Sequence, residues 1–191
     1  MKKVLLHICC GVCAAGAAHR LHEEGFGVAG FYFNPNIHPR DEYEKRKENL
    51  KHIRAAFDIE VIEGEYAPRK WFDVCRGFAD EPERGTRCQL CYRLRLQETY
   101  RVSKEKKFDY FTTTLTISPH KESSVVFEIA KSVGGEAFLP VDFKKKDGFK
   151  IANQFAKEHD LYRQDYCGCV YSLLKRRSHI VIPWNSQNSR D

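Results

Sequence analysis

The stretch VLLHICCGVC, residues 4–13, decides the fold of this chain. Residues 4–8 are a short, mostly apolar run with the length of a buried strand. Cys9, Cys10 and Gly11 follow as a loop, and small residues at helical spacing then continue from about residue 12 to residue 24. Gly25 and Gly27 end this helix. A strand that leads through a short loop into a helix is typical of the first unit of an α/β fold.

The same alternation continues along the chain. Further strands are predicted at residues 28–33, 59–62, 108–115 and 136–139, and further helices at 39–57, 119–134 and 149–161, with an interrupted helical segment at 64–107. Successive units of this kind form a parallel sheet with right-handed crossovers. We therefore predict an α/β fold, Rossmann-like, with a parallel sheet of about five strands and flanking helices. We expect residues 1–182 to form one domain and the polar tail 183–191 to be disordered.

The predicted sheet also suggests where a site would lie. Ligands of open parallel sheets bind beyond the carboxyl ends of the strands, where the strand order reverses. The first strand ends at Cys9 and Cys10, and the fourth contains the threonines at residues 112–114. If these strands are neighbours, the cysteines lie in the binding pocket.

Cysteine usage calls for a chemical explanation. A chain of 191 residues buries roughly 70 % of its unfolded surface and folds without disulfides. Seven of the eight cysteines form three tight groups, which favours metal or redox chemistry. A secreted disulfide protein is the alternative, but such scaffolds are usually short. No apolar run reaches the roughly 18 residues of a membrane span. We expect a cytoplasmic protein that does not enter the membrane.

The charge balance favours a polyanionic partner. Lysine and arginine exceed aspartate and glutamate by 32 − 26 = 6, and basic residues gather at 45–47, 104–107, 144–146 and 175–177. RNA is a plausible partner for such clusters. The alternative is that they are solvated helix faces and loops.

The pair Cys88-x-x-Cys91 alone fits zinc, a thiol–disulfide pair or an iron–sulfur cluster. Cys9, Cys10 and Cys13 raise the number of thiolates to four or five, and adjacent ligands suit a cluster better than one tetrahedral zinc. The start of the following helix also favours thiolates. The alternative is that the first three cysteines are small buried residues at a strand–helix junction.

The third group, Cys167-Gly168-Cys169, favours a different role. Two thiols at this spacing close only into a small strained ring, and strain makes a disulfide easy to reduce. The pair is therefore a candidate redox switch, or else two buried thiols.

Other residues carry weaker signals. Cys75 is expected to be a packing residue and His7 a core histidine. The candidates for a proton donor are His38, His120 and Asp165.

Five motifs in this order carry a family resemblance: HICCGVC at residues 7–13, YFNPNIH at 32–38, CQLCYR at 88–93, TTTLTIS at 112–118 and DYCGCVYS at 165–172. The chain resembles the QueH family, which are cobalamin-independent epoxyqueuosine reductases. The resemblance implies a two-electron removal of the epoxide oxygen from epoxyqueuosine in the wobble position of tRNA. It also implies a fold similar to the adenine-nucleotide-hydrolase-like Rossmann group.

The resemblance assigns roles to the three cysteine groups. Cys9, Cys10, Cys88 and Cys91 would hold a [4Fe-4S] cluster, Cys167 and Cys169 would form a redox-active disulfide, and Cys13 is left as a candidate ligand for one additional iron. The implied partners are tRNA with a GUN anticodon and an external electron donor. Stacking on the modified base would involve aromatic and arginine side chains in the motifs, namely Tyr32, Tyr92, Arg93 and Tyr171. The alternative is that these side chains only pack behind the site.

Two rival functions use the same features. A tRNA-thiolating enzyme of the ATP-pyrophosphatase type shares the expected fold, but its phosphate loop is rich in serine and carries an aspartate, whereas residues 9–14 read CCGVCA. A zinc-stabilised RNA-binding module would use the thiols for structure and the basic residues for RNA.

Overall fold

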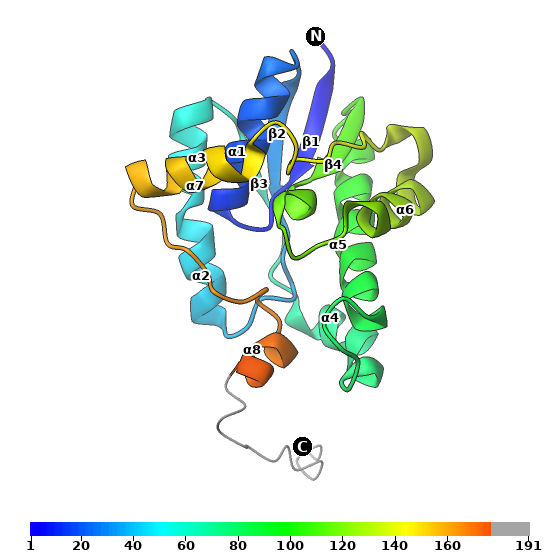
Figure 1. Cartoon of the computed structure of the whole chain (residues 1–191). Coiled ribbons are helices and arrows are strands. Elements are labelled where there is room, and N and C mark those ends of the chain that lie inside the picture. Colours follow the sequence, from blue (N-terminus) through cyan, green and yellow to red (C-terminus); the bar gives the residue numbers. More distant parts are fainter. Residues whose placement is uncertain (177–191) are drawn as a thin grey trace.

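A computed structural model describes residues 1–176 of the chain (Figure 1). Its strands are β1 (Lys3–His7), β2 (Gly27–Tyr32), β3 (Val61–Glu63) and β4 (Tyr110–Thr113). Its α-helices are α1 (Gly11–Glu23), α2 (Arg40–Glu48), α3 (Leu50–Phe57), α4 (Pro68–Cys75), α5 (Thr86–Glu105), α6 (Ser123–Gly134), α7 (Gly148–Glu158) and α8 (Val170–Arg176). Short 3-10 turns cover Arg76–Phe78, Thr114–Ile117 and Gly135–Ala137.

The four strands form one parallel sheet in the order β3-β2-β1-β4. The chain first winds from β1 to β2 and β3 on one side, and then returns to place β4 on the other side of β1. The strand order therefore reverses between β1 and β4, and these strands pair with His7 opposite Thr113 at their carboxyl ends. The predicted α/β fold and its switch point are confirmed.

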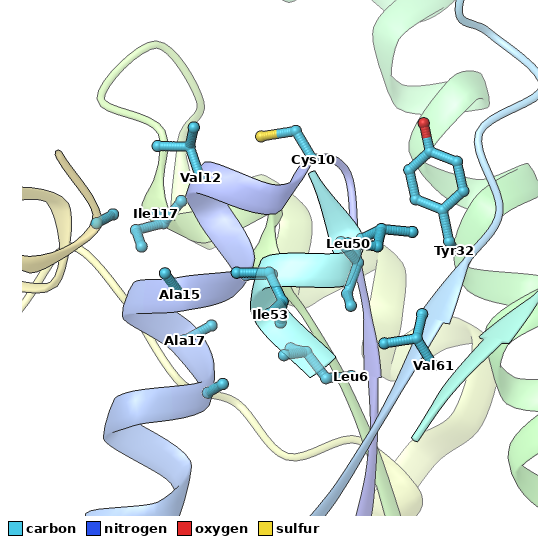
Figure 2. Close-up of a cluster of buried hydrophobic side chains, with 14 of the residues drawn as sticks. Leu6, Cys10, Val12, Ala15, Ala17, Tyr32, Leu50, Ile53, Val61 and Ile117 are labelled. Atoms are coloured by element: carbon cyan, nitrogen blue, oxygen red, sulfur yellow. The ribbon is translucent and has the colours of Figure 1, made fainter. Parts of the chain in front are cut away.

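Helices cover both faces of the sheet, each over its own apolar core. On one face α1 packs against α3 and α7, and its alanines meet Leu6 and Ile53 in the core of Figure 2. The other face carries α5 and α6, which enclose Leu5, Phe31 and Phe111. Helices α1 and α7 approach so closely that a Cβ on Gly16 would lie 2.4 Å from the carbonyl oxygen of Gly148.

The prediction of a fifth strand at residues 136–139 is wrong. These residues begin in a 3-10 turn, and only a single bridge joins Phe138 to Phe111, with the amide of Leu139 donating to the carbonyl of Phe111 at 2.9 Å. Pro140 follows at once and has no N–H with which to extend a ladder. The amide of Val141 instead donates back to the carbonyl of Leu139 at 3.0 Å.

The single helix predicted at residues 39–57 is two helices that meet at Asn49. The side-chain Nδ2 of Asn49 donates to the backbone carbonyl of Tyr162 at 2.7 Å, and its Oδ1 accepts from the backbone N–H of Tyr162 at 3.2 Å. Gly11 lies against this break, where a Cβ would come within 2.5 Å of Asn49 Cβ. The break thus brings the first turn of α1 and the segment before α8 together at the carboxyl end of the sheet.

Two expectations concern the chain as a whole. None of the helices in residues 1–176 is both long and apolar enough to cross a membrane. The predicted disordered tail at residues 183–191 lies outside the described residues.

Candidate active site

A cavity of about 730 Å³ lies beyond the carboxyl ends of the strands. In Figure 1 the strands point toward a region bordered by α2, α4, α5 and α8. Six of the eight cysteines line this cavity, and they come from all three sequence groups: Cys9, Cys13, Cys88, Cys91, Cys167 and Cys169. Residues separated by up to 160 positions are thus brought to one place by the sheet and its crossovers.

The first cysteine group is compact. The Sγ atoms of Cys9, Cys10 and Cys13 all lie within 4.8 Å of one another, with Cys9 and Cys10 4.0 Å apart. Cys10 caps α1 by accepting from the amide of Cys13 at 3.5 Å, so the group occupies the positive end of the helix dipole. Three thiols in this arrangement can hold a metal ion or one edge of a metal cluster.

The surroundings of Cys9 lower the pKa of its thiol. Hydrogen bonds from Cys10 and Cys13 lower the pKa of Cys9 well below its ordinary value, and the charges of Lys121 and Arg95 act in the same direction against burial. The hydroxyl of Thr114 also donates to Cys9 Sγ at 3.1 Å, and it accepts from the Cys9 amide at 3.0 Å. Of the three thiols, Cys9 is therefore the one whose ionised form these surroundings favour.

The second group enters from helix α5. Cys88 and Cys91 are one turn apart and both line the cavity, outside the compact group formed by the first three cysteines. The amide of Arg84 donates to Cys88 Sγ at 3.3 Å. Burial raises the pKa of Cys91, while the charge of Arg95 acts to lower it. The thiolate form of this pair thus needs a further positive partner, such as a metal.

The two thiols of the third group lie close together. The Sγ atoms of Cys167 and Cys169 are 3.5 Å apart. Hydrogen bonding from Cys169 lowers the pKa of Cys167 to about 6, with smaller contributions from the Cys169 amide and the Ser172 side chain. The pKa of Cys169 is raised, chiefly by the same interaction with Cys167. One nucleophilic thiolate beside one protonated thiol is the arrangement of a dithiol pair that exchanges with disulfides.

The cavity wall is strongly basic. It contains two acids, Glu83 and Asp165, against eight cations: Arg46, Arg84, Arg87, Arg95, Lys121, Arg163, Lys175 and Arg176. Arg95 is buried, yet its hydrogen-bond partners are the neutral acceptors Asn34, at 2.6 Å, and His7, at 3.3 Å. Burial and Arg95 lower the pKa of His7 to about 3, so His7 stays uncharged. The wall is suited to an anionic occupant.

Several buried polar atoms in the described part of the chain lack a partner, and most of them belong to this wall. They are Asn36 Oδ1, Trp71 Nε1, Arg87 Nε and Gln164 Oε1 on the cavity, together with His38 Nε2. Buried polar groups in native proteins are almost always hydrogen-bonded. Atoms left over around one cavity indicate that the cavity receives a ligand with polar atoms of its own.

The structure separates the proposed RNA contacts. Tyr92 lines the cavity, whereas Arg93 does not and donates to Ser132 on α6 at 3.0 Å. Tyr171 packs against the cation of Arg87, 4.7 Å from its ring centre. The prediction that Tyr32 stacks on a base is wrong, because its ring is fully buried in the core of Figure 2 and its hydroxyl donates to the Tyr43 carbonyl.

The candidate proton donors are also separated. His120 and Asp165 line the cavity, and Asp165 forms an ion pair with Arg176 at 3.0 Å. His38 is not on the cavity wall and packs between the rings of Trp71 and Phe72. The first two therefore remain as candidates on geometric grounds.

Sequence reasoning missed residues that touch the cysteines. Thr114 bonds Cys9, and the amide nitrogen of Gln164 donates to Cys10 Sγ at 3.1 Å. Arg95 follows Cys91 by four positions on α5, and this helical spacing was the available signal for it. No comparable signal marks Gln164, which lies in the irregular segment before α8.

Comparison with known proteins agrees with this site. A family profile for epoxyqueuosine reductase QueH matches residues 4–175. The chain is 35 % identical over 187 residues to the epoxyqueuosine reductase QueH of Streptococcus pyogenes serotype M1, covering 93 % of this chain and 73 % of that protein. It is 34 % identical to the protein of the same name from Thermotoga maritima, covering 93 % of each.

One solved structure shares the fold. It is a U34-tRNA thiolase NcsA from Methanococcus maripaludis with its [4Fe-4S] cluster, which superposes with a TM-score of 0.51 at 16 % identity. The match covers 93 % of this chain and 62 % of the thiolase. At this identity the likeness concerns the fold. The profile and the curated relatives, in contrast, reach across nearly the whole chain and include all three cysteine groups, so the chain belongs to the epoxyqueuosine reductase QueH family of oxidoreductases.

Proposed function

We propose that this chain reduces epoxyqueuosine to queuosine in the wobble position of tRNA. The observation that carries the proposal is the meeting of three cysteine groups at one basic cavity. Removing an epoxide oxygen as water, with formation of a carbon–carbon double bond, consumes two electrons and two protons. The site must therefore combine an electron supply, a proton supply and a pocket for the modified base.

Cys167 and Cys169 match the electron and proton demand. Oxidation of their two thiols to one disulfide releases two electrons and two protons, which is the amount that the epoxide consumes. The sulfur atoms are 3.5 Å apart and need to approach to about 2.05 Å to form the bond. An external electron donor, such as a small dithiol or a reduced redox protein, then returns the pair to the dithiol state.

Cys9, Cys10, Cys88 and Cys91 are proposed to hold a [4Fe-4S] cluster. The donor set fits, because Cys9, Cys88 and Cys91 line the same cavity and Cys10 Sγ lies 4.0 Å from Cys9 Sγ. Unpartnered N–H groups of Trp71 and Arg87 border the same space. A bound cluster would supply one-electron transfer and Lewis acidity. Cys13 is proposed as a ligand for one additional iron, since its Sγ belongs to the compact group with Cys9 and Cys10.

The cavity mouth supports contact with tRNA. Arg84, Arg163 and Arg176 are exposed on its wall, where they can meet phosphates, and Tyr92 offers a ring to the base. We propose a tRNA with a GUN anticodon as the substrate and the cytoplasm, where thiols stay reduced, as the compartment. We also propose that residues 1–182 form one domain.

The reaction is tested on tRNA that bears epoxyqueuosine. Iron-loaded, reduced protein is incubated with this tRNA without oxygen. The RNA is then digested to nucleosides, and the mass of the modified nucleoside is measured by mass spectrometry. The expected product has lost one oxygen atom, and tRNA with unmodified guanosine in the same position serves as the control. An unchanged nucleoside mass in the presence of fully loaded protein would remove the proposed reaction.

The cofactor is tested on the protein alone. Protein purified without oxygen should be brown and contain iron and acid-labile sulfide, and Cys88→Ala should lose both. The variants Cys167→Ser and Cys169→Ser should keep the iron of the parent protein. Colourless protein with stoichiometric zinc would instead support a structural zinc site. Loss of iron from the Cys167→Ser variant would show that Cys167 is a ligand.

A further inference from the structure

The backbone of the third cysteine group is held by one neighbouring segment. The carbonyl of Tyr166 accepts from Arg46 Nη2 at 3.1 Å, and the carbonyl of Cys167 accepts from Arg46 Nη1 at 3.2 Å. The next carbonyl, that of Gly168, accepts from the His38 amide at 2.8 Å. Three consecutive carbonyls therefore bond to residues 38–46, and two of them bond to a single guanidinium.

Arg46 is itself fixed. It is 2 % exposed, and its Nε donates to Glu42 Oε1 at 2.7 Å within helix α2. The second carboxylate oxygen of Glu42 accepts from the Tyr162 hydroxyl at 2.6 Å. The ring of Tyr166 lies 5.2 Å from the guanidinium carbon. The planar guanidinium thus joins α2 to the cysteine loop with every nitrogen in use, which an ammonium group could not do.

The loop has no room to move toward this anchor. Gly168 has φ = +108°, a conformation that side chains disfavour. A Cβ at this position would come within 2.9 Å of Ile37 Cγ1 and 3.0 Å of Arg46 Nη1. The backbone at Gly168 therefore lies close against Ile37 and Arg46, and a side chain at this position would push the loop away from Arg46.

We propose that Arg46 is a positioning residue for the redox pair, because it holds the loop in the conformation that keeps the two sulfur atoms within closing distance. The inference rests on the redox role proposed above for Cys167 and Cys169. Fixing the loop raises the effective concentration of one thiol at the other and so favours the disulfide. Without this anchor the dithiol form gains conformational freedom, and the disulfide becomes easier to reduce.

The experiment measures the dithiol–disulfide equilibrium directly. Purified protein is equilibrated without oxygen in mixtures of reduced and oxidised glutathione, quenched, alkylated and analysed by mass spectrometry of the peptide that contains Cys167 and Cys169. In this exchange the protein thiols lose two electrons and two protons, which convert one oxidised glutathione into two reduced glutathione molecules. The variants are Arg46→Lys and the double change Glu42→Gln with Arg46→Gln, which leaves no buried charge unpaired.

Both variants are expected to lower the equilibrium constant for disulfide formation about tenfold, which corresponds to a rise of about 30 mV in reduction potential. The matched control is Arg20→Lys, since Arg20 also pairs with a glutamate at 2.7 Å on its own helix but does not touch the loop. Gly168→Ala changes the loop instead of the arginine, because the added Cβ would push against Ile37 and Arg46. It should also lower the equilibrium constant for disulfide formation. Circular dichroism and iron content identify variants that have not folded.

The two proposals fail in different ways. If the parent protein forms no Cys167–Cys169 disulfide at any ratio of reduced to oxidised glutathione, the redox role itself is refuted. If the parent protein forms the disulfide and the folded Arg46 variants stay within about twofold of its equilibrium constant, the positioning role is refuted while the redox role stands.

Discussion

Replacing Thr114 by valine tests whether the chain stabilises the thiolate of Cys9. Thr114 is fully buried and follows β4, next to the loop after β1. Its hydroxyl donates to Cys9 Sγ at 3.1 Å and accepts from the Cys9 amide at 3.0 Å. Valine keeps the shape of the side chain but removes both hydrogen bonds. Thr114→Ser is the control, because serine keeps the hydroxyl.

The two lost hydrogen bonds have separate effects. A hydrogen bond to a charged acceptor contributes about 1.5–3 kcal/mol, so its loss should raise the pKa of Cys9. The Cys9 amide is left without an acceptor, which costs about 1–3 kcal/mol in the free energy of unfolding. Thr114→Val should therefore weaken metal binding at neutral pH and lower the stability of the metal-free protein.

Urea denaturation of metal-free protein measures the second effect, and iron per chain after reconstitution at limiting iron measures the first. We expect Thr114→Val to lose about 1–3 kcal/mol and to bind less iron than Thr114→Ser. If Thr114→Val matches the parent protein in both denaturation midpoint and iron content, the reasoning is refuted, because threonine and valine have nearly the same shape and differ by a hydroxyl in place of a methyl group.

Three further predictions concern the thiols and the packing. Because the pKa of Cys167 is about 6, its alkylation by iodoacetamide should be half-maximal near pH 6 and should fall at lower pH, as followed by site-resolved mass spectrometry; a midpoint near 9 would contradict this. Removal of iron with an anaerobic chelator should lower the melting temperature in calorimetry, since metal binds the folded thiols, and an unchanged temperature would argue against a metal at the site. Gly16→Ala should cost about 1–3 kcal/mol in urea denaturation because of the Gly148 carbonyl, whereas Gly77→Ala, with open space around it, should cost far less.

The sequence was most informative about the sheet. The apolar runs of β1, β2 and β4 and the periodic helices between them predict the parallel sheet. The same pattern predicts that Cys9 lies where the strand order reverses, which the sheet confirms. The predicted fifth strand failed because a run of four residues followed by Pro140 can form only one bridge. The sequence pattern could not predict the helix break at Asn49, because the partner of its side chain is the backbone of Tyr162, which is distant in the sequence.

The site was predicted unevenly for a similar reason. Cysteine spacing identified the residues that meet at the cavity, since few other roles explain three such groups. Arg46 was hidden in the basic run Lys45-Arg46-Lys47, which resembles a solvated helix face, and only the structure shows that its middle member is buried. For Tyr32 the error is the reverse. The prediction placed its ring in the binding site, but the tyrosine at the end of β2 faces the core.

The origin of the cavity walls has a consequence for how the protein is made. The first wall is synthesised with β1 and α1 and the second with α5, while the wall at residues 163–176 emerges from the ribosome much later. Chains acquire structure from the amino end during synthesis. Until the late segment docks, the first two cysteine groups face an open basin. If these groups hold the proposed iron–sulfur cluster, we expect iron and sulfide to bind before this segment docks. A nascent chain released after α7 should then accept the proposed cluster faster than the finished protein.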